Sequence, residues 1–149
     1  MSDERTTAVL VQLFAEARFS EAEGVARGLV KEHPDSAIGW KALGTALGST
    51  HRHLEAIQAF DRALEAVPAD AETLANLGVA CRATGQRERA RGCFEKALKI
   101  QPAQLKALLE LGHLFNEDGR YEEAQATFEH AAATHSASAE ILGGLEKAL

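Results

Sequence analysis

The chain contains only three prolines, and Pro34, Pro68 and Pro102 follow one another at intervals of 34 residues. Further columns of identical residues share this interval. These columns are Leu43, Leu77 and Leu111; Gly44, Gly78 and Gly112; Ala56, Ala90 and Ala124; Phe60, Phe94 and Phe128; and Ala63, Ala97 and Ala131. A period of roughly 20 to 50 residues indicates a repeat array, in which each unit buries its apolar face against its neighbours. The chain is therefore expected to stack similar units in a row.

The predicted repeats extend over nearly the whole sequence when Trp40 is taken as the fourth position of a unit. They cover 3–36, 37–70, 71–104 and 105–138, followed by a terminal helix over 139–149. The first unit departs from the others, because it has Val9 and Leu10 where they have Leu and Gly. The total length of 149 residues is the usual size of one domain, so 1–149 is expected to form a single domain.

Each unit is predicted to contain two antiparallel helices. In the third unit, residues at i, i+3, i+4 and i+7 share one face of a first helix: Leu74, Leu77, Gly78 and Cys81. A second helix repeats the pattern with Ala90, Phe94 and Ala97. Gly78 and Ala90 are expected where the two helices cross, because bulkier side chains there would push the helix axes apart.

The turn between the two helices carries glycine in the last two units. Gly85 and Gly119 can adopt the left-handed conformation that ends a helix. Ala17 and His51 occupy the same place in the first two units. Because residues with a Cβ atom rarely adopt that conformation, these two turns are predicted to close differently.

Capping residues predict where several helices begin and end. Ser20 followed by Glu23 is typical of a capping box, and Ser36, Asp70 and Ser138 stand where a first helix needs its N-cap. The proline that closes each repeat is expected to stop the second helix.

The second repeat resembles the tetratricopeptide repeat family. The matching residues are Trp40-Lys41-Ala42-Leu43-Gly44, followed by Ala56, Phe60, Ala63 and Pro68. The resemblance implies an all-α, right-handed superhelical solenoid of antiparallel helix pairs, with about four repeats plus a C-terminal helix. It also implies a concave surface lined by the first helices, where members of the family usually bind peptides.

Composition excludes several classes of partner and compartment. A net charge of −6 gives no basic excess to neutralise phosphates, so no nucleic acid is expected as a partner. The polar first residues do not resemble a secretory signal, and no apolar run is long enough to span a membrane. Cys81 and Cys93 are the only cysteines and lack the spacing of a zinc site. They are predicted to be free, buried thiols, and the protein is expected to be cytoplasmic.

No pattern in the sequence supports catalysis. The motifs of serine hydrolases, phosphate loops, dinucleotide-binding folds and zinc proteases are all missing, so the protein is predicted not to be an enzyme and to need no cofactor. His51 and His53 lie in a predicted loop without a third ligand nearby, so no metal site is expected. His130 and His135 are interpreted as solvated surface residues.

Helical periodicity predicts which side chains line the concave groove, since one stripe of each first helix is displaced from the packing stripe. The predicted peptide-binding residues are Val11, Phe14, Ile38, Lys41, Thr45, Asn76, Val79, Arg82, Lys106, Leu109, His113 and Asn116. The apolar members would form the floor of the groove. The cations Lys41, Arg82 and Lys106 would favour a peptide with some acidic character. The alternative interpretation is that these residues are merely solvated.

Three functions remain open from the sequence. The first is a protein-interaction scaffold or adaptor that binds a protein or peptide segment in the groove. The second is the non-catalytic arm of a larger enzyme of the sugar transferase or sulfotransferase type. The third is a scaffold that forms a homo-oligomer through the C-terminal helix, where Ile141, Leu142, Leu145 and Leu149 form an apolar stripe.

Overall fold

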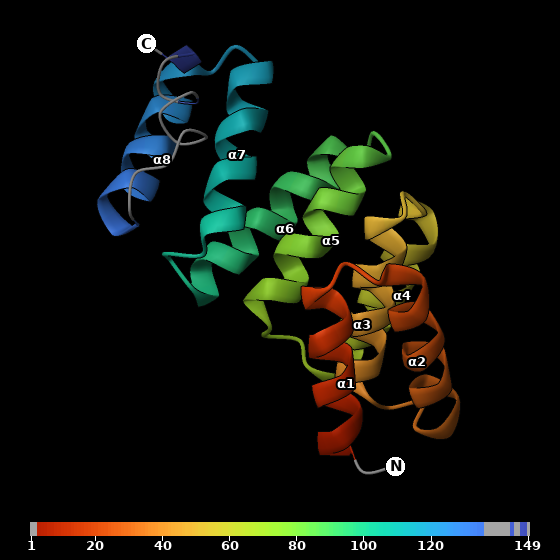
Figure 1. Ribbon diagram of the computed structural model, residues 1–149. Helices are drawn as coiled ribbons and strands as arrows, with labels where there is room; N and C mark the ends of the chain where they lie inside the picture. Colours follow the sequence, from red (N-terminus) through yellow and green to blue (C-terminus); the bar gives the residue numbers. More distant parts are fainter. Residues whose placement is uncertain (1–2, 136–143, 145–146, 149) are drawn as a thin grey trace.

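The protein is an array of helical hairpins. The computed structural model describes residues 3–135, 144 and 147–148, and among them it contains eight helices longer than two turns and no strand. The helices are α1 Asp3–Ala15, α2 Phe19–Glu32, α3 Ala37–Ser49, α4 His53–Ala66, α5 Ala71–Ala83, α6 Arg87–Ile100, α7 Leu105–Glu117 and α8 Tyr121–Thr134. Each helix packs against the next one in the chain, so the hairpins follow one another from α1 and α2 to α7 and α8 (Figure 1).

The repeated glycine and phenylalanine columns form one packing contact that recurs in three hairpins. A Cβ atom added at Gly44, Gly78 or Gly112 would lie only 2.6, 2.4 or 2.6 Å from the phenylalanine ring of the same repeat. Each ring therefore rests directly on the backbone of the first helix. The prediction that small residues mark the helix crossing is confirmed, and it explains why a fixed interval relates both columns.

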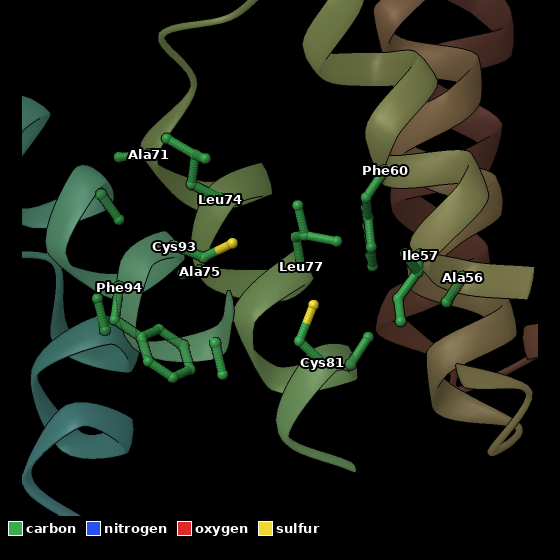
Figure 2. Packing of buried hydrophobic residues seen from close by; sticks show 14 of the residues in the cluster. Ala56, Ile57, Phe60, Ala71, Leu74, Ala75, Leu77, Cys81, Cys93 and Phe94 are labelled. Carbon is green, nitrogen blue, oxygen red and sulfur yellow. The ribbon is translucent and has the colours of Figure 1, made fainter. Parts of the chain in front are cut away.

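Both cysteines belong to the buried cluster between α5 and α6. Cys81 is fully buried and Cys93 is nearly so, and both are free thiols (Figure 2). A hydrogen bond with Cys81, together with burial, raises the pKa of the Cys93 thiol. A thiol in this state is a poor nucleophile, so it acts as a small apolar core residue.

All four turns within the hairpins close in the same way, so the prediction for the first two was wrong. Ala17 and His51 have φ values of 56° and 63°, beside 81° for Gly85 and 76° for Gly119. In each turn the next residue donates its backbone N–H to a carbonyl five residues back, as Arg52 does to Leu47 at 2.8 Å. Satisfying the last helical carbonyls outweighs the steric cost of a Cβ atom at φ > 0.

The capping predictions for the first helices are confirmed where the structure describes them. The Ser36 hydroxyl accepts the N–H of Gly39 at 3.0 Å, and the Asp70 carboxylate accepts that of Glu72 at 3.2 Å. Ser138 lies outside the described residues, as do most of the predicted terminal helix 139–149 and its apolar stripe. The first helix of the fourth repeat, α7, has Gln104 as its N-cap, a position for which the sequence gave no prediction.

The predicted capping box in the first repeat is not formed. Ser20 lies inside α2, and the N-cap is Arg18, which makes no side-chain cap hydrogen bond. The tight turn at Ala17 leads directly into α2, so this helix begins earlier in the chain than the capping box predicted. The second helices do end just before the repeat prolines, as predicted: α2 ends at Glu32, ahead of Pro34. Within the described part of the chain, no helix is long and apolar enough to cross a membrane.

Candidate functional site

The first helices of the second, third and fourth hairpins enclose a cavity of about 280 Å³. We call it the α3–α5–α7 cavity. Its lining residues are Gly44, Thr45, Gly48 and Ser49 of α3; Asn76, Val79 and Ala80 of α5; Lys106 and Glu110 of α7; and His53 and Phe60 of α4. The cavity therefore spans three successive repeats.

The floor of the cavity is apolar and owes its depth to two glycines. At Gly44 the backbone lies against the Phe60 ring, which leaves no room for a side chain. At Gly48, one helical turn further, an added Cβ atom would meet nothing within 4 Å. With Val79 beside them, these residues form an open apolar surface that a ligand side chain could cover.

Polar groups stand around this floor. The Lys106 ammonium donates to Oδ1 of Asn76 at 2.6 Å, which joins α7 to α5 across the cavity. Nδ1 of His53 is shielded from solvent and has no hydrogen-bond partner among the described residues. Buried polar atoms are normally satisfied, so the His53 ring would have to turn before this nitrogen could bind a ligand.

Four of the twelve predicted groove residues meet in this cavity: Thr45, Asn76, Val79 and Lys106. Two apolar members of the prediction lie on the surface elsewhere, since Val11 on α1 is 64% exposed and Ile38 at the start of α3 is 50% exposed. Phe14 is half-buried, and its ring centroid lies 6.3 Å from that of Phe19.

The predicted residues on α7 are largely turned toward the protein interior. Leu109 is only 7% exposed and belongs to the hydrophobic core, so it offers almost no surface to a ligand. The ring of His113 is half-buried and lies 5.2 Å from the Phe128 ring in an edge-on arrangement. The amide atoms of Asn116 are shielded from solvent without a hydrogen-bond partner in the described part of the chain. These positions of α7 face the protein interior more than helical periodicity alone predicts.

Two of the three predicted cations are paired with acids on the following first helix or at its N-cap. The Lys41 ammonium lies 3.1 Å from the Asp70 carboxylate and 3.0 Å from that of Glu72. Arg82 contacts Glu110 at 2.8 Å and also contacts Glu117. These ion pairs join successive first helices, so the charges of Lys41 and Arg82 are largely neutralised within the protein.

The ion pairs shift the protonation equilibria of their members. Partial burial acts to lower the pKa of Lys41, but hydrogen bonds to Glu72 and Asp70 outweigh it and raise the pKa. Burial acts to raise the pKa of the Asp70 carboxyl, but hydrogen bonds from Thr73 and Lys41 hold the pKa below its usual value. Both groups are therefore charged at neutral pH.

The histidines do not form a metal centre with their neighbours. The rings of His51 and His53 lie 5.8 Å apart, and His53 is the first residue of α4, not a loop residue as predicted. His130 contacts the Pro102 carbonyl at 3.0 Å, and His135 contacts that of Ala103, so both are bonded to the turn between α6 and α7. Among the described residues, no three His, Cys, Asp or Glu side chains gather so that they could hold a metal ion.

His53, Phe60 and Gly44 line the cavity, but they were not among the residues predicted from the sequence. Gly44 and Phe60 belong to repeated columns, which the sequence explains fully by packing. His53 occupies a column that reads Phe19, His53, Arg87 and Tyr121 in the four repeats, so no pattern distinguished it. Gly48 was the one residue that could have indicated the open space of the cavity, because the two following units carry the larger Arg82 and Asn116 at that position.

Sequence comparison connects the chain with known repeats. Profiles described as tetratricopeptide repeat match residues 12–71, 71–104 and 93–126, so together they extend from the first repeat into the fourth. No curated protein gives a significant match to the chain.

Solved structures share the architecture. The thermophilic TPR protein TTC0263 of Thermus thermophilus has a TM-score of 0.82 at 19% identity, over 99% of this chain and 81% of that chain. MamA from Desulfovibrio magneticus RS-1 has a TM-score of 0.79 at 20% identity, over 89% and 75%. The Sgt2 TPR domain from Aspergillus fumigatus has a TM-score of 0.69 at 28% identity, over 75% and 76%. The predicted all-α solenoid of antiparallel helix pairs is confirmed.

Proposed function

Because the chain belongs to the tetratricopeptide repeat family, we propose that it is a non-catalytic protein-interaction scaffold that binds a partner's peptide segment in the α3–α5–α7 cavity. Members of this family generally bind proteins or peptides and act as scaffolds. The observation that carries the proposal is the open apolar floor at Gly48, between first helices of three repeats.

The open shape of the cavity, whose volume is near the lower end for drug-sized ligands, favours a side-chain anchor over a small-molecule ligand. Sites for drug-sized ligands usually measure about 300 to 1,000 Å³ and enclose most of the ligand. The α3–α5–α7 cavity measures about 280 Å³ and is open to solvent on one side. We expect it to receive one or two apolar side chains of an extended or helical segment.

The rim of the cavity can orient such a segment. Thr45, Asn76 and Lys106 supply hydroxyl, amide and ammonium groups within reach of a peptide backbone. Glu110 adds a hydrogen-bond acceptor. Since acids of this chain already neutralise Lys41 and Arg82, the proposal places apolar contact before charge in recognition.

We also propose that the protein works in a reducing compartment. Cys81 and Cys93 are buried, adjacent and free, which suits the cytoplasm better than an oxidising compartment.

A substitution that fills the cavity tests the proposal. Gly48→Leu would place an aliphatic side chain on the floor, where the backbone has open space and leucine favours the helix. A phage-displayed library of random linear peptides is selected on the wild-type chain, and the affinities of the selected peptides are measured by anisotropy. We expect Gly48→Leu to keep its helicity and to bind these peptides at least about tenfold more weakly.

Gly28→Leu is the matched control, because Gly28 is exposed on α2, has equally open space and does not line the cavity. It should bind the selected peptides as the wild type does. If Gly48→Leu binds them equally well, the site lies elsewhere. If both leucine variants lose binding alike, the effect is not specific to the cavity.

A further inference from the structure

The outer side of the first hairpin bears an open groove of about 540 Å³ that the preceding proposal does not use. We call it the N-terminal groove. Its exposed apolar part is formed by Val9 of α1 and Val25 of α2, beside the buried Leu13, and Arg18 and Glu21 stand at one end. Val9 is 36% exposed, which makes it one of the few exposed large apolar residues of the described chain.

The repeat itself shows what normally covers such a surface. The residues 34 positions later are Leu43, Leu47 and Ala59, and they are only 4%, 2% and 2% exposed. They are buried because α2 packs across α3, and Leu29 and Val30 of α2 come close to the α3 backbone at Gly39. The N-terminal groove is therefore a helix-binding surface of the same design, without a helix on it.

Ion pairs between α2 and the second hairpin indicate which charges a covering helix would carry. Arg52 pairs with Glu23 of α2 at 2.7 Å, and Glu55 lies 3.6 Å from Arg27 of the same helix. The covering helix thus presents an acid and a base four residues apart, on one face. In the N-terminal groove, Arg18 and Glu21 occupy the positions of Arg52 and Glu55 and form the same local ion pair. Arg18 also contacts Glu16 at 2.8 Å, so an acid of a bound helix would share the guanidinium with Glu16.

We propose that the N-terminal groove binds an amphipathic helix of a partner protein, which packs on α1 as α2 packs on α3. The bound helix has small and aliphatic residues toward Val9 and Val25, an acid facing Arg18 and, four residues later, a base facing Glu21. This surface is separate from the α3–α5–α7 cavity and does not depend on the function proposed for it.

Comparison with the packing of α2 on α3 also argues against a second copy of the chain as the occupant of the N-terminal groove. The residues of α8 that correspond to Glu23 and Arg27 are Gln125 and Glu129. A copy stacked end to end would place Glu129 opposite Glu21, and like charges repel. The groove also differs from the internal junction at one point. At Gly39 of α3 an added Cβ atom would lie 2.9 Å from Val30 of α2, and the corresponding residue is Arg5, so the bound helix needs a residue smaller than valine at the position of Val30. A bound helix would bring its C-terminal carbonyls toward this guanidinium, which suits the helix dipole.

The test uses the chain's own covering helix as the probe. A fluorescein-labelled peptide carries the sequence of Phe19–Glu32 with Val30→Ala, which makes room for Arg5, and with Gly24→Ala and Gly28→Ala, which raise helicity. Both glycines face open space in the protein, so these changes do not alter the packing surface. Binding to the full chain is followed by fluorescence anisotropy. We expect saturable binding that Gly48→Leu leaves unchanged and Val9→Glu abolishes.

Val11→Glu is the matched control, because Val11 lies on the same helix, is more exposed and does not line the groove. It should bind the peptide as the wild type does. A peptide with Glu23→Arg and Arg27→Glu should bind the wild type roughly three- to tenfold more weakly, and the Arg18→Glu, Glu21→Arg protein should restore its binding.

Three results would overturn the proposal. They are a peptide that shows no saturable binding, a Val9→Glu variant that binds as the wild type does, and equal losses for Val9→Glu and Val11→Glu. Sedimentation provides the last check. A dimer of the wild-type chain that Val9→Glu dissociates would make a second copy the occupant, contrary to the proposal.

Discussion

The ammonium of Lys41 in α3 lies 3.1 Å from the carboxylate of Asp70, the residue that caps α5 in the next repeat. The same carboxylate accepts the hydroxyl of Thr73 at 2.7 Å and the backbone N–H of Glu72 at 3.2 Å. One side chain therefore starts a first helix and attaches it to the preceding one. Neighbouring repeats are coupled through this contact as well as through their apolar faces.

Asp70→Asn should reduce stability in a pH-dependent way. Asparagine is as good an N-cap as aspartate, so the change removes mainly the charge that faces Lys41. The expected loss at neutral pH is about 1 kcal/mol, since the pair is only partly buried. The folded-state pKa of Asp70 is lowered, so its contribution is present above the unfolded pKa and is lost as pH falls through the folded pKa.

Urea unfolding of Asp70→Asn and the wild type, followed by circular dichroism at neutral and acidic pH, measures this effect. The difference in unfolding free energy should shrink on acidification, because the wild type then protonates Asp70 and loses the same interaction. A difference that stays constant or grows toward low pH would show that the Lys41–Asp70 pair does not stabilise the array.

Gly78→Ala should destabilise the third hairpin, although alanine favours helices. The new methyl group would lie 2.4 Å from the buried Phe94 ring, which cannot move aside in a close-packed core. We expect a loss of about 1 to 3 kcal/mol in unfolding free energy. Gly92→Ala on α6 is the matched control, since its Cβ would meet nothing within 4 Å, and it should gain about 0.5 to 1 kcal/mol. Equal effects of the two changes on thermal unfolding would contradict the packing described for the glycine column.

Ala17→Gly and His51→Gly should each stabilise the protein. Both residues adopt φ values that cost a side chain about 1 kcal/mol, whereas glycine reaches them freely. Glycine also adds flexibility to the unfolded chain, so the expected net gain is only a few tenths of a kcal/mol to about 1 kcal/mol. Chemical unfolding of the two variants measures the gain. Lower stability in both would mean that the contacts of the Ala17 and His51 side chains matter more than the backbone conformation.

The sequence predicted the fold well because the repeat supplies the same evidence several times. The interval between Pro34 and Pro68, the glycine–phenylalanine columns and the helical period all lead to stacked hairpins. It failed at Ala17 and His51, where residue type suggested a different turn and the demands of helix termination prevailed. Tertiary context, not a local pattern, decides such positions.

The candidate site was predicted less well, because helical periodicity gives the direction of a side chain and not its partners. The sequence placed Lys41 and Arg82 correctly on first helices, but the acids that neutralise them lie on the following first helix or at its N-cap, about 30 residues away. Leu109 was expected on the surface and is buried, because neighbouring helices cover a wider face of α7 than its packing stripe alone. The depth at Gly48 depends on three repeats together, which no single helix pattern can show.

Arg82 and Glu110 should prove energetically coupled, and the coupling bears on the α3–α5–α7 cavity that Glu110 lines. Their side chains are 32% and 21% exposed and meet at 2.8 Å, so the pair is less screened than a surface ion pair. Arg82→Met leaves Glu110 and Glu117 without this counter-charge and should cost about 1 to 2 kcal/mol of unfolding free energy. Glu110→Gln should cost less, because it leaves no buried carboxylate behind.

A double-mutant cycle of Arg82→Met and Glu110→Gln, measured by urea unfolding, separates this interaction from the rest. The double variant should be more stable than the sum of the single losses predicts, by about 0.5 to 1 kcal/mol. Arg87→Met is a useful comparison, because Arg87 also contacts Glu117, at 2.6 Å, but does not contact Glu110. It should show no such coupling with Glu110→Gln. If the Arg82 and Glu110 losses simply add, the pair is a solvated contact and does not hold Glu110 in place at the cavity.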